Sequence, residues 1–244
     1  MVDISGIDII LACWLIDQDT WDMTKSSISS LKELGDNRLI VVDNASPMGG
    51  GYLREVADIY IRNQTNLGYA PANNQALKLV QSEYVCFAQN DTFPYKNALS
   101  VSKEILDEHK DVATVHIKMG INGEDLVLGE DVWVTGKERW CSFSFFVARR
   151  SAIDFLDENY IMANYEDYDF LQNVRTKGFK TAYTNKTGYI HNDSYTQRKL
   201  DQEERQKWAD INKEYFKSKW GDYPDECFQK QFSEQWEVPW RPFP

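Results

Sequence analysis

Short apolar segments alternate with helical patterns over residues 7–88, and this alternation constrains the fold more than any other feature of the sequence. Residues 7–14, 38–42, 59–61 and 84–88 each read as a buried strand, because they are apolar almost throughout rather than at every second position. Strands that are apolar on both faces and separated by helices are typical of a mostly parallel sheet covered on both sides. The sequence therefore predicts an α/β fold.

The helices between these strands are predicted from the residues at their ends. Thr24 is suited to cap the first helix, whose apolar pattern stops before Gly35. A short helix is expected over residues 52–57. Pro71 is expected to open the next helix, which carries Ala76, Leu77 and Val80, because proline suits the first helical turn.

The second half of the chain is less regular. We expect a helix over 99–106, an extended segment over 112–116, and a hairpin or irregular excursion over 117–138 with a turn at Asn122-Gly123. A strand at 143–147, a short helix at 151–156 and two short extended segments at 179–183 and 188–191 follow. A long amphipathic helix is predicted over 200–219, with one apolar face made of Trp208, Ile211, Tyr215 and Phe216.

The composition narrows the class of partner. The 244 residues are 42% hydrophobic, which is enough to bury a substantial core. The net charge of −11, from 27 basic and 38 acidic residues, argues against nucleic acid, because nucleic-acid binders usually carry a basic surface. A single nucleotide remains compatible with this charge, since a metal ion can neutralise its phosphates.

The cysteines indicate neither a disulfide framework nor a zinc site, because Cys13, Cys86, Cys141 and Cys227 share no short spacing. The first apolar run is too short to span a bilayer and contains Asp8. No basic segment precedes it, as a signal peptide would require. We therefore expect a cytoplasmic protein with no transmembrane segment.

Polar or aromatic residues follow three of the predicted strands. They are Cys13-Trp14, Asp43-Asn44 and Asn90-Asp91. The carboxyl ends of parallel strands meet at one edge of a sheet, and ligands of open α/β sheets bind there. A carboxylate and a carboxamide after a strand suit a nucleotide base, although Asp43 is equally suited to an Asx-turn that closes the strand.

Two further motifs suggest a phosphate and metal site. The segment Asn66–Gly68 precedes a helix start that contains Asn73-Asn74, and this arrangement resembles a polar cradle at a helix N-terminus. Asp91 could supply a carboxylate to a divalent cation that also binds substrate phosphates. His191 is either a structural histidine or a further metal ligand.

Three acids cluster at the start of a predicted helix that ends at Gly178. Glu166, Asp167 and Asp169 cannot all lie on a buried face, because unpaired charge is costly to desolvate. In isolation the cluster is explained by the helix dipole, which favours acids in the first turn. The alternative is a catalytic site, which requires the other motifs to face the same turn.

Taken in order, the motifs resemble those of inverting glycosyltransferases of family 2, especially the rhamnosyltransferase-like branch. The matching segments are Val42-Asp43-Asn44-Ala45-Ser46, Asn66-Leu67-Gly68-Tyr69-Ala70 with Asn73-Asn74, Gln89-Asn90-Asp91, Glu166-Asp167-Tyr168-Asp169, His191, and Asn212 through Lys219-Trp220-Gly221. The resemblance covers roughly residues 7–221.

The resemblance implies a GT-A fold, which is a Rossmann-like, mostly parallel sheet flanked by helices, in a single domain of residues 1–221. Within it, residues 1–98 would bind the nucleotide sugar, residues 99–199 would hold the acceptor and the catalytic residues, and 200–221 would form a C-terminal helix. Residues 222–244 would be a tail.

The resemblance also implies the site residues. Nucleotide and substrate contacts would come from Ala12, Cys13, Trp14, Asp43, Asn44, Asn66, Gly68, Tyr69, Asn74, Gln89, Asn90, Glu166 and Asp169. Asp91 and His191 would bind Mn²⁺ or Mg²⁺ on the donor diphosphate, and Asp167 would be the catalytic base. Gln89 stands where the family often has Asp or Asn, which leaves one carboxylate at this strand end.

The implied reaction is metal-dependent transfer of a sugar from a UDP-, dTDP- or GDP-sugar donor to a hydroxyl of a glycan or glycoconjugate, as in polysaccharide biosynthesis. Two alternatives remain open. A nucleotidyltransferase could use the same kind of sheet, but the sequence lacks an early Gly-rich basic phosphate loop. A non-catalytic nucleotide-sugar- or glycan-binding module is the other, and the presence of Asp91, Asp167 and His191 together argues against it.

Overall fold

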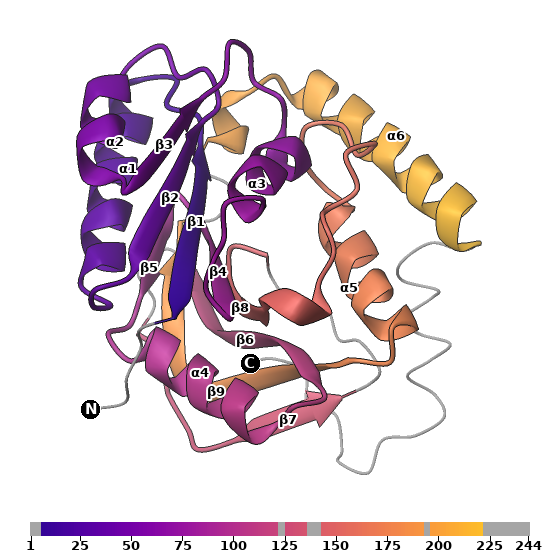
Figure 1. Cartoon of the computed structure of the whole chain (residues 1–244). Helices are drawn as coiled ribbons and strands as arrows, with labels where there is room; N and C mark the ends of the chain where they lie inside the picture. Colours follow the sequence, from indigo (N-terminus) through magenta and orange to yellow (C-terminus); the bar gives the residue numbers. More distant parts are fainter. Residues whose placement is uncertain (1–5, 122–124, 136–142, 193–195, 222–244) are drawn as a thin grey trace.

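A computed structural model describes residues 6–121, 125–135, 143–192 and 196–221 (Figure 1). The strands are β1 (Ile7–Cys13), β2 (Arg38–Asp43), β3 (Ile59–Arg62), β4 (Tyr84–Gln89), β5 (Thr92–Pro94), β6 (Val112–Ile121), β7 (Val132–Thr135), β8 (Phe145–Arg149) and β9 (Lys180–His191). The helices are α1 (Gln18–Lys32), α2 (Gly50–Val56), α3 (Tyr69–Leu77), α4 (Ala98–Glu108), α5 (Glu166–Thr176) and α6 (Gln202–Trp220), with short 3₁₀ turns η1 (Arg150–Ala152) and η2 (Gln197–Lys199).

The strands form one sheet in the order β3-β2-β1-β4-β8-β6-β9-β5, and β7 pairs with β9. The first four of these are parallel, as the alternating pattern predicts. Strand β8 is antiparallel to both β4 and β6, while β5 and β7 are antiparallel to β9. Antiparallel neighbours do not need a crossover helix, so strands and helices do not alternate regularly in the second half of the chain.

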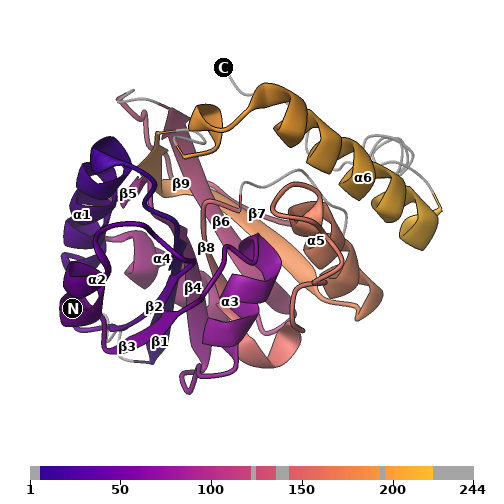
Figure 2. The same ribbon diagram turned by 90° about the horizontal axis from the view of Figure 1, so that it is seen from above.

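Helices cover both faces of the sheet (Figures 1 and 2). On one face, α1, α2 and α4 pack on side chains that include Ile9 and Leu11 of β1. On the other face, α3 and α5 pack on side chains that include Ile10 of β1 and Phe87 of β4. Successive strand residues point to opposite faces, so a strand covered on both sides is apolar at every position. The predicted α/β fold is confirmed.

Helix α6 lies beside α5 in both views (Figures 1 and 2). Phe216 on α6 is fully buried. At the end of the helix, the indole Nε1 of Trp220 donates a hydrogen bond of 2.7 Å to Asp169 of α5. A largely polar helix is therefore fixed to the domain by a few specific contacts.

Two predicted helix boundaries are wrong. Helix α1 is capped by Asp17, whose side chain accepts from the backbone N–H of Thr20, and Thr24 lies inside the helix with its hydroxyl bonded to a backbone carbonyl. Both residues are good cap formers, and the local pattern did not distinguish them. Helix α3 begins at Tyr69 rather than at Pro71, which occupies its first turn.

Several predicted elements of the second half also differ. The helix expected at 151–156 is only the 3₁₀ turn η1, and the strand expected at 143–147 is β8, shifted by two residues. The extended segments at 179–183 and 188–191 are one strand, β9, which crosses a register shift where it pairs with β6. The predicted turn at Asn122-Gly123 and the tail 222–244 lie outside the described residues.

No helix in the described ranges is long and apolar enough to cross a membrane.

Candidate functional site

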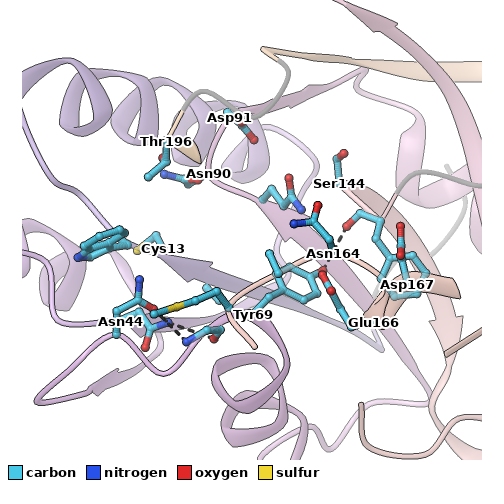
Figure 3. A pocket seen from close by; sticks show the side chains of 18 of the residues that line it. Cys13, Asn44, Tyr69, Asn90, Asp91, Ser144, Asn164, Glu166, Asp167 and Thr196 are labelled. Atoms are coloured by element: carbon cyan, nitrogen blue, oxygen red, sulfur yellow. Dashed lines mark hydrogen bonds between the residues drawn. The ribbon is translucent and has the colours of Figure 1, made fainter. Parts of the chain in front are cut away.

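A cavity of about 290 Å³ lies at the carboxyl ends of the parallel strands (Figure 3). Its wall includes Ala12, Cys13 and Trp14 after β1, Asn44 after β2, and Gln89 at the end of β4. Strand β1 pairs with β2 on one side and β4 on the other, so the chain reverses its direction of travel across the sheet at this point. Crevices of this kind are the usual binding sites of open α/β sheets.

The cavity brings together most of the residues predicted from the sequence. Those in its wall are Ala12, Cys13, Trp14, Asn44, Asn66, Gly68, Tyr69, Gln89, Asn90, Asp91, Glu166, Asp167 and His191. They come from β1, β4 and β9, from α3 and α5, and from the loops after β1, after β2, before α3 and between β4 and β5. Figure 3 shows Asp91 and the Glu166-Asp167 turn reaching the cavity from separate elements.

Asp43 differs from the prediction, because it is fully buried and does not line the cavity. Its carboxylate accepts hydrogen bonds from the backbone N–H of Ser46 at 2.8 Å and from the hydroxyl of Tyr60 at 2.7 Å. The same carboxylate forms an ion pair with Arg62. Asp43 thus closes the loop after β2 and holds β3 in place, which is the structural alternative considered for it.

Asn74 and Asp169 also lie outside this cavity. The side chain of Asn74 both donates to and accepts from the backbone of Leu156, at 2.8 Å each way. Asp169 is bonded to Trp220 and paired with Lys219, both on α6. Asn73-Asn74 lies beyond the first turn of α3, so these residues form no polar cradle at its N-terminus.

The turn before α3 is held by a side chain from the loop that follows β2. Asn44 accepts from the backbone N–H of Leu67 at 3.0 Å and donates to Asn66 at 2.6 Å and to the carbonyl of Gly68 at 3.2 Å. Gly68 has φ +90°, and a Cβ there would come 2.9 Å from the Cα of Met162. Only glycine therefore allows this turn to pack against the loop that precedes α5.

The loop that precedes α5 is strained. Met162, Asn164 and Tyr165 all have positive φ, of 57°, 83° and 71°. Non-glycine residues rarely adopt this conformation, and each instance costs on the order of 1 to 3 kcal/mol. Met162 and Asn164 line the cavity, and the loop leads directly into Glu166 and Asp167. The surrounding structure must therefore hold this loop in place.

Asn212 of α6 holds the strained loop. Its side-chain oxygen accepts from the backbone N–H of Ile161 at 2.8 Å, and its Nδ2 donates to the carbonyls of Ile161, Ala163 and Asn164 at 2.9 to 3.0 Å. Asn212 is fully buried. One side chain therefore satisfies four backbone groups that the left-handed turns keep out of regular hydrogen bonding.

The N-cap residue of helix α5, Tyr165, has a left-handed backbone and makes no side-chain cap bond. Asp167 lies in this first turn, lines the cavity, and accepts from the backbone N–H of Tyr168 at 2.8 Å. The helix dipole favours a negative charge at this position. Asp167 is thus a carboxylate that is stabilised by backbone groups and faces the cavity.

Glu166 is in a different environment. It is 7% exposed, and its Oε2 has no hydrogen-bond partner among the described residues. Burial raises the pKa of the Glu166 carboxyl well above its usual value, and the charge of neighbouring Asp167 raises it further. The two adjacent acids therefore differ in environment, because burial disfavours the charged form of Glu166.

Asp91 and His191 form the candidate metal site. Antiparallel pairing of β5 with β9 sets Thr92 opposite His191, which brings the residue before Thr92 alongside. The Oδ1 of Asp91 lies 3.3 Å from the Nε2 of His191, and this buried Nε2 has no hydrogen-bond partner within the described ranges. Neighbouring ligands of one Mg²⁺ or Mn²⁺ ion are roughly 3 Å apart, so the two atoms fit a shared cation.

Ser144, which the sequence did not indicate, orients the imidazole. Its hydroxyl lies 3.2 Å from the Nδ1 of His191. A proton on Nδ1, donated to Ser144, leaves Nε2 free to bind a metal. The described residues contain no group of three or more His, Cys, Asp and Glu side chains suited to a metal. The remaining ligands would therefore be substrate phosphates and water, as is common for Mg²⁺.

The sequence missed a second part of the cavity wall. These residues are Met119, Phe143, Ser144, Met162, Ala163, Asn164, Thr196, Leu200, Arg205 and Trp208. Those on α6 could have been found by their spacing, because residues 205, 208 and 212 fall on one face of a helix. The predicted apolar face obscured this, since it included Ile211, which is 42% exposed.

Comparison with known proteins gives a family match. Residues 18–155, more than half of the chain, match glycosyl transferase family 2. A search of curated protein sequences gave no match.

Solved structures with the same fold include TarS 1–349 of S. aureus, at 15% identity and a TM-score of 0.59, covering 88% of this chain and 74% of that one. The same protein in complex with UDP-GlcNAc has 16% sequence identity and a TM-score of 0.57, and the match covers 80% of this chain and 61% of that one. GalNAc-T7 with UDP, GalNAc and Mn²⁺ has 10% identity and a TM-score of 0.58, and the match covers 76% of this chain and 43% of that one. The chain thus spans less than two thirds of the length of these last two structures. Identities this low establish the fold alone.

Replacing Asn212 with alanine is expected to lower the free energy of unfolding by about 3 kcal/mol or more, because several buried backbone groups of the strained loop lose their partners. Urea denaturation measures this change. Ile211→Ala, on the exposed side of the same helix turn, should change stability by no more than about 0.5 kcal/mol. Equal effects of the two variants would show that Asn212 does not hold the loop.

Glu166→Gln is expected to change the pH dependence of stability. Above its ordinary pKa of 4.5, Glu166 retains its proton in the folded state but loses it in the unfolded state. The folded state then binds more protons, so wild-type stability falls as pH rises through this window. Glu166→Gln has no titratable group at this position and so lacks this pH-dependent loss of stability. Its stability relative to wild type should therefore increase from pH 4 to pH 8 in urea denaturation, and a constant difference would contradict the assignment.

Proposed function

Because the chain belongs to glycosyl transferase family 2 and has the GT-A fold, it is a glycosyltransferase, and we propose that it transfers a sugar from a nucleoside-diphosphate sugar to an acceptor hydroxyl with inversion. The observation that carries this proposal is the meeting of two groups in one cavity. Asp167 enters from α5, and the Asp91–His191 pair enters from the edge of the β5–β9 ladder.

The carboxyl ends of β1, β2 and β4 support binding of the nucleotide. Trp14 offers an aromatic face at the cavity wall, and Asn66 offers an amide there. The similar TarS structure was solved in complex with UDP-GlcNAc, and GalNAc-T7 with UDP and GalNAc. We propose a UDP-, dTDP- or GDP-sugar as the donor, and a hydroxyl of a glycan or glycoconjugate as the acceptor.

Asp91 and His191 would hold Mn²⁺ or Mg²⁺ on the donor diphosphate. When bound, the cation neutralises negative charge that develops on the departing diphosphate. Ser144 fixes the imidazole ring, and the buried position of both ligands keeps competing water away. Gln89 lies in the cavity wall without adding a second carboxylate.

The proposed reaction is a single displacement. The acceptor oxygen forms a bond to the anomeric carbon while the bond from that carbon to the diphosphate oxygen breaks, and its electron pair leaves with the diphosphate. The acceptor proton passes to the carboxylate of Asp167, which is a general-base role worth about 10² to 10⁴ in rate. Attack from the face opposite the leaving group inverts the anomeric centre.

The environment supports Asp167 rather than Glu166 as this base. A base must be ionised before it can accept a proton, and burial raises the pKa of the Glu166 carboxyl. Glu166 is therefore less suited than Asp167 to accept the acceptor proton. Asp167 lines the cavity at the start of α5, where its carboxylate accepts a hydrogen bond from the backbone N–H of Tyr168.

Asp167→Asn is expected to lower the transfer rate by about 10² to 10⁴ while the affinity for donor nucleotide changes little, because the amide cannot accept the proton. Nucleotide release is measured with UDP-, dTDP- and GDP-sugars, and affinity by calorimetry. Asp154→Asn, an exposed acid paired with Lys177, is the matched control and should retain activity. Loss of nucleotide binding by Asp167→Asn would identify Asp167 as a structural acid, and donor binding without transfer by wild type would indicate a binding module.

Asp91→Asn and His191→Ala are each expected to weaken nucleoside-diphosphate binding in the presence of Mn²⁺ by about tenfold or more, because each removes one of the two protein ligands. In EDTA the variants and wild type should bind alike. The measurement is a titration of nucleoside diphosphate at several Mn²⁺ concentrations. A variant that keeps the wild-type metal dependence would exclude that residue as a ligand.

A further inference from the structure

Arg205 is the sole lysine or arginine in the cavity wall formed by the described residues. The same wall contains three acids, Asp91, Glu166 and Asp167. The whole chain carries a net charge of −11, because its 38 acidic residues outnumber its 27 basic ones. A single basic side chain at this position is therefore informative.

Arg205 differs from Lys199 and Lys219 in forming no ion pair with an acid among the described residues. Lys199 pairs with Asp17 at 2.6 Å, and Lys219 pairs with Asp157 at 2.7 Å. Arg205 forms no such pair within the described part of the chain, and its buried Nε has no hydrogen-bond partner there. A buried donor without a partner costs on the order of 1 to 3 kcal/mol, and such a group in a native protein calls for an explanation.

The position of Arg205 along α6 indicates what it faces. Two helical turns further on, Asn212 is bonded to the loop before Glu166 and Asp167. Arg205 is roughly 10 Å from that point along the helix axis, towards the N-terminal end. The segment that leads into the N-terminal end of α6 begins beside Asp91 and His191, because the backbone N–H of Asn192 donates to the backbone carbonyl of Asp91. Arg205 therefore lies towards the Asp91–His191 end of the cavity wall.

We propose that Arg205 binds the phosphoryl oxygens of the donor diphosphate, opposite the Asp91–His191 pair. A guanidinium presents paired N–H groups that match two phosphate oxygens, and it stays charged at all relevant pH values. The diphosphate would gain a second positive group in addition to the cation. This inference rests on the proposed function, and it adds α6 to the donor site.

The charge of the departing diphosphate makes such a group useful in the reaction. Bond cleavage places additional negative charge on the diphosphate, and a donor that is already oriented stabilises this charge without reorganisation. The guanidinium also offsets repulsion between the diphosphate and the acids of the same wall. Loss of Arg205 should therefore affect ligands in proportion to the number of phosphates they carry.

The test compares nucleoside diphosphates and monophosphates as probes. Dissociation constants of UDP, GDP and dTDP, and of the corresponding monophosphates, are measured with Mg²⁺ for wild type, Arg205→Gln and Lys207→Gln. Lys207 is exposed on the same helix and does not line the cavity, so its replacement removes the same charge from elsewhere. Melting temperatures of all three proteins establish that each one folds.

Arg205→Gln is expected to weaken binding of the preferred diphosphate by roughly 10- to 100-fold, and to weaken binding of the corresponding monophosphate by a smaller factor. Lys207→Gln should change the dissociation constant of either ligand by less than about twofold. Wild-type affinity for the diphosphate in Arg205→Gln would overturn the inference, and so would equal weakening of diphosphate and monophosphate. A raised KM for a phosphate-bearing acceptor with unchanged diphosphate affinity would overturn it in favour of the acceptor. If wild type itself binds none of the diphosphates, the proposed function fails, which is a distinct outcome.

Discussion

Parallel pairing of β1 with β2 and β4 is the constraint on which the cavity depends. Ala12 is opposite Val42 on one side and Gln89 on the other, so three strands end at nearly the same level. The residues that follow β1, β2 and β4 therefore lie together at the carboxyl-terminal edge of the sheet. A shift of one residue in either pairing would turn the apolar side chains of β1 towards the wrong layer, so burial on both faces holds the register.

The second half of the sheet adds chemistry through a different kind of contact. Asp91 and His191 are far apart in sequence, and they meet because the three-residue strand β5 pairs antiparallel with the end of β9. No local pattern encodes that pairing. The sequence singles out Asp91 by its strand end and His191 by its rarity, whereas their proximity follows only from the complete sheet.

Local signals explain which predictions succeeded. The four parallel strands, the residues at their ends and the acidic first turn of α5 are all specified by neighbouring residues, and most of the residues predicted from these signals line the cavity. Asp43 and Asp169 are acids of the same kind that point elsewhere, because partners distant in sequence take them up. Arg62 comes from the next parallel strand and Trp220 from the last helix. A carboxylate next to a motif cannot be assigned to a site until such partners are known.

Three buried polar groups without hydrogen-bond partners among the described residues gather in the cavity, which is an observation independent of any family motif. Most buried polar atoms of a native protein are hydrogen-bonded. Among the described residues, Glu166 Oε2, His191 Nε2 and Arg205 Nε are buried without such a partner, and all three residues line this one cavity. The strained loop held by Asn212 lies in the same wall. The unpartnered polar groups and the strained loop both lower stability, and they come from several elements that meet at this cavity. A bound substrate would supply hydrogen-bond partners to these polar groups together.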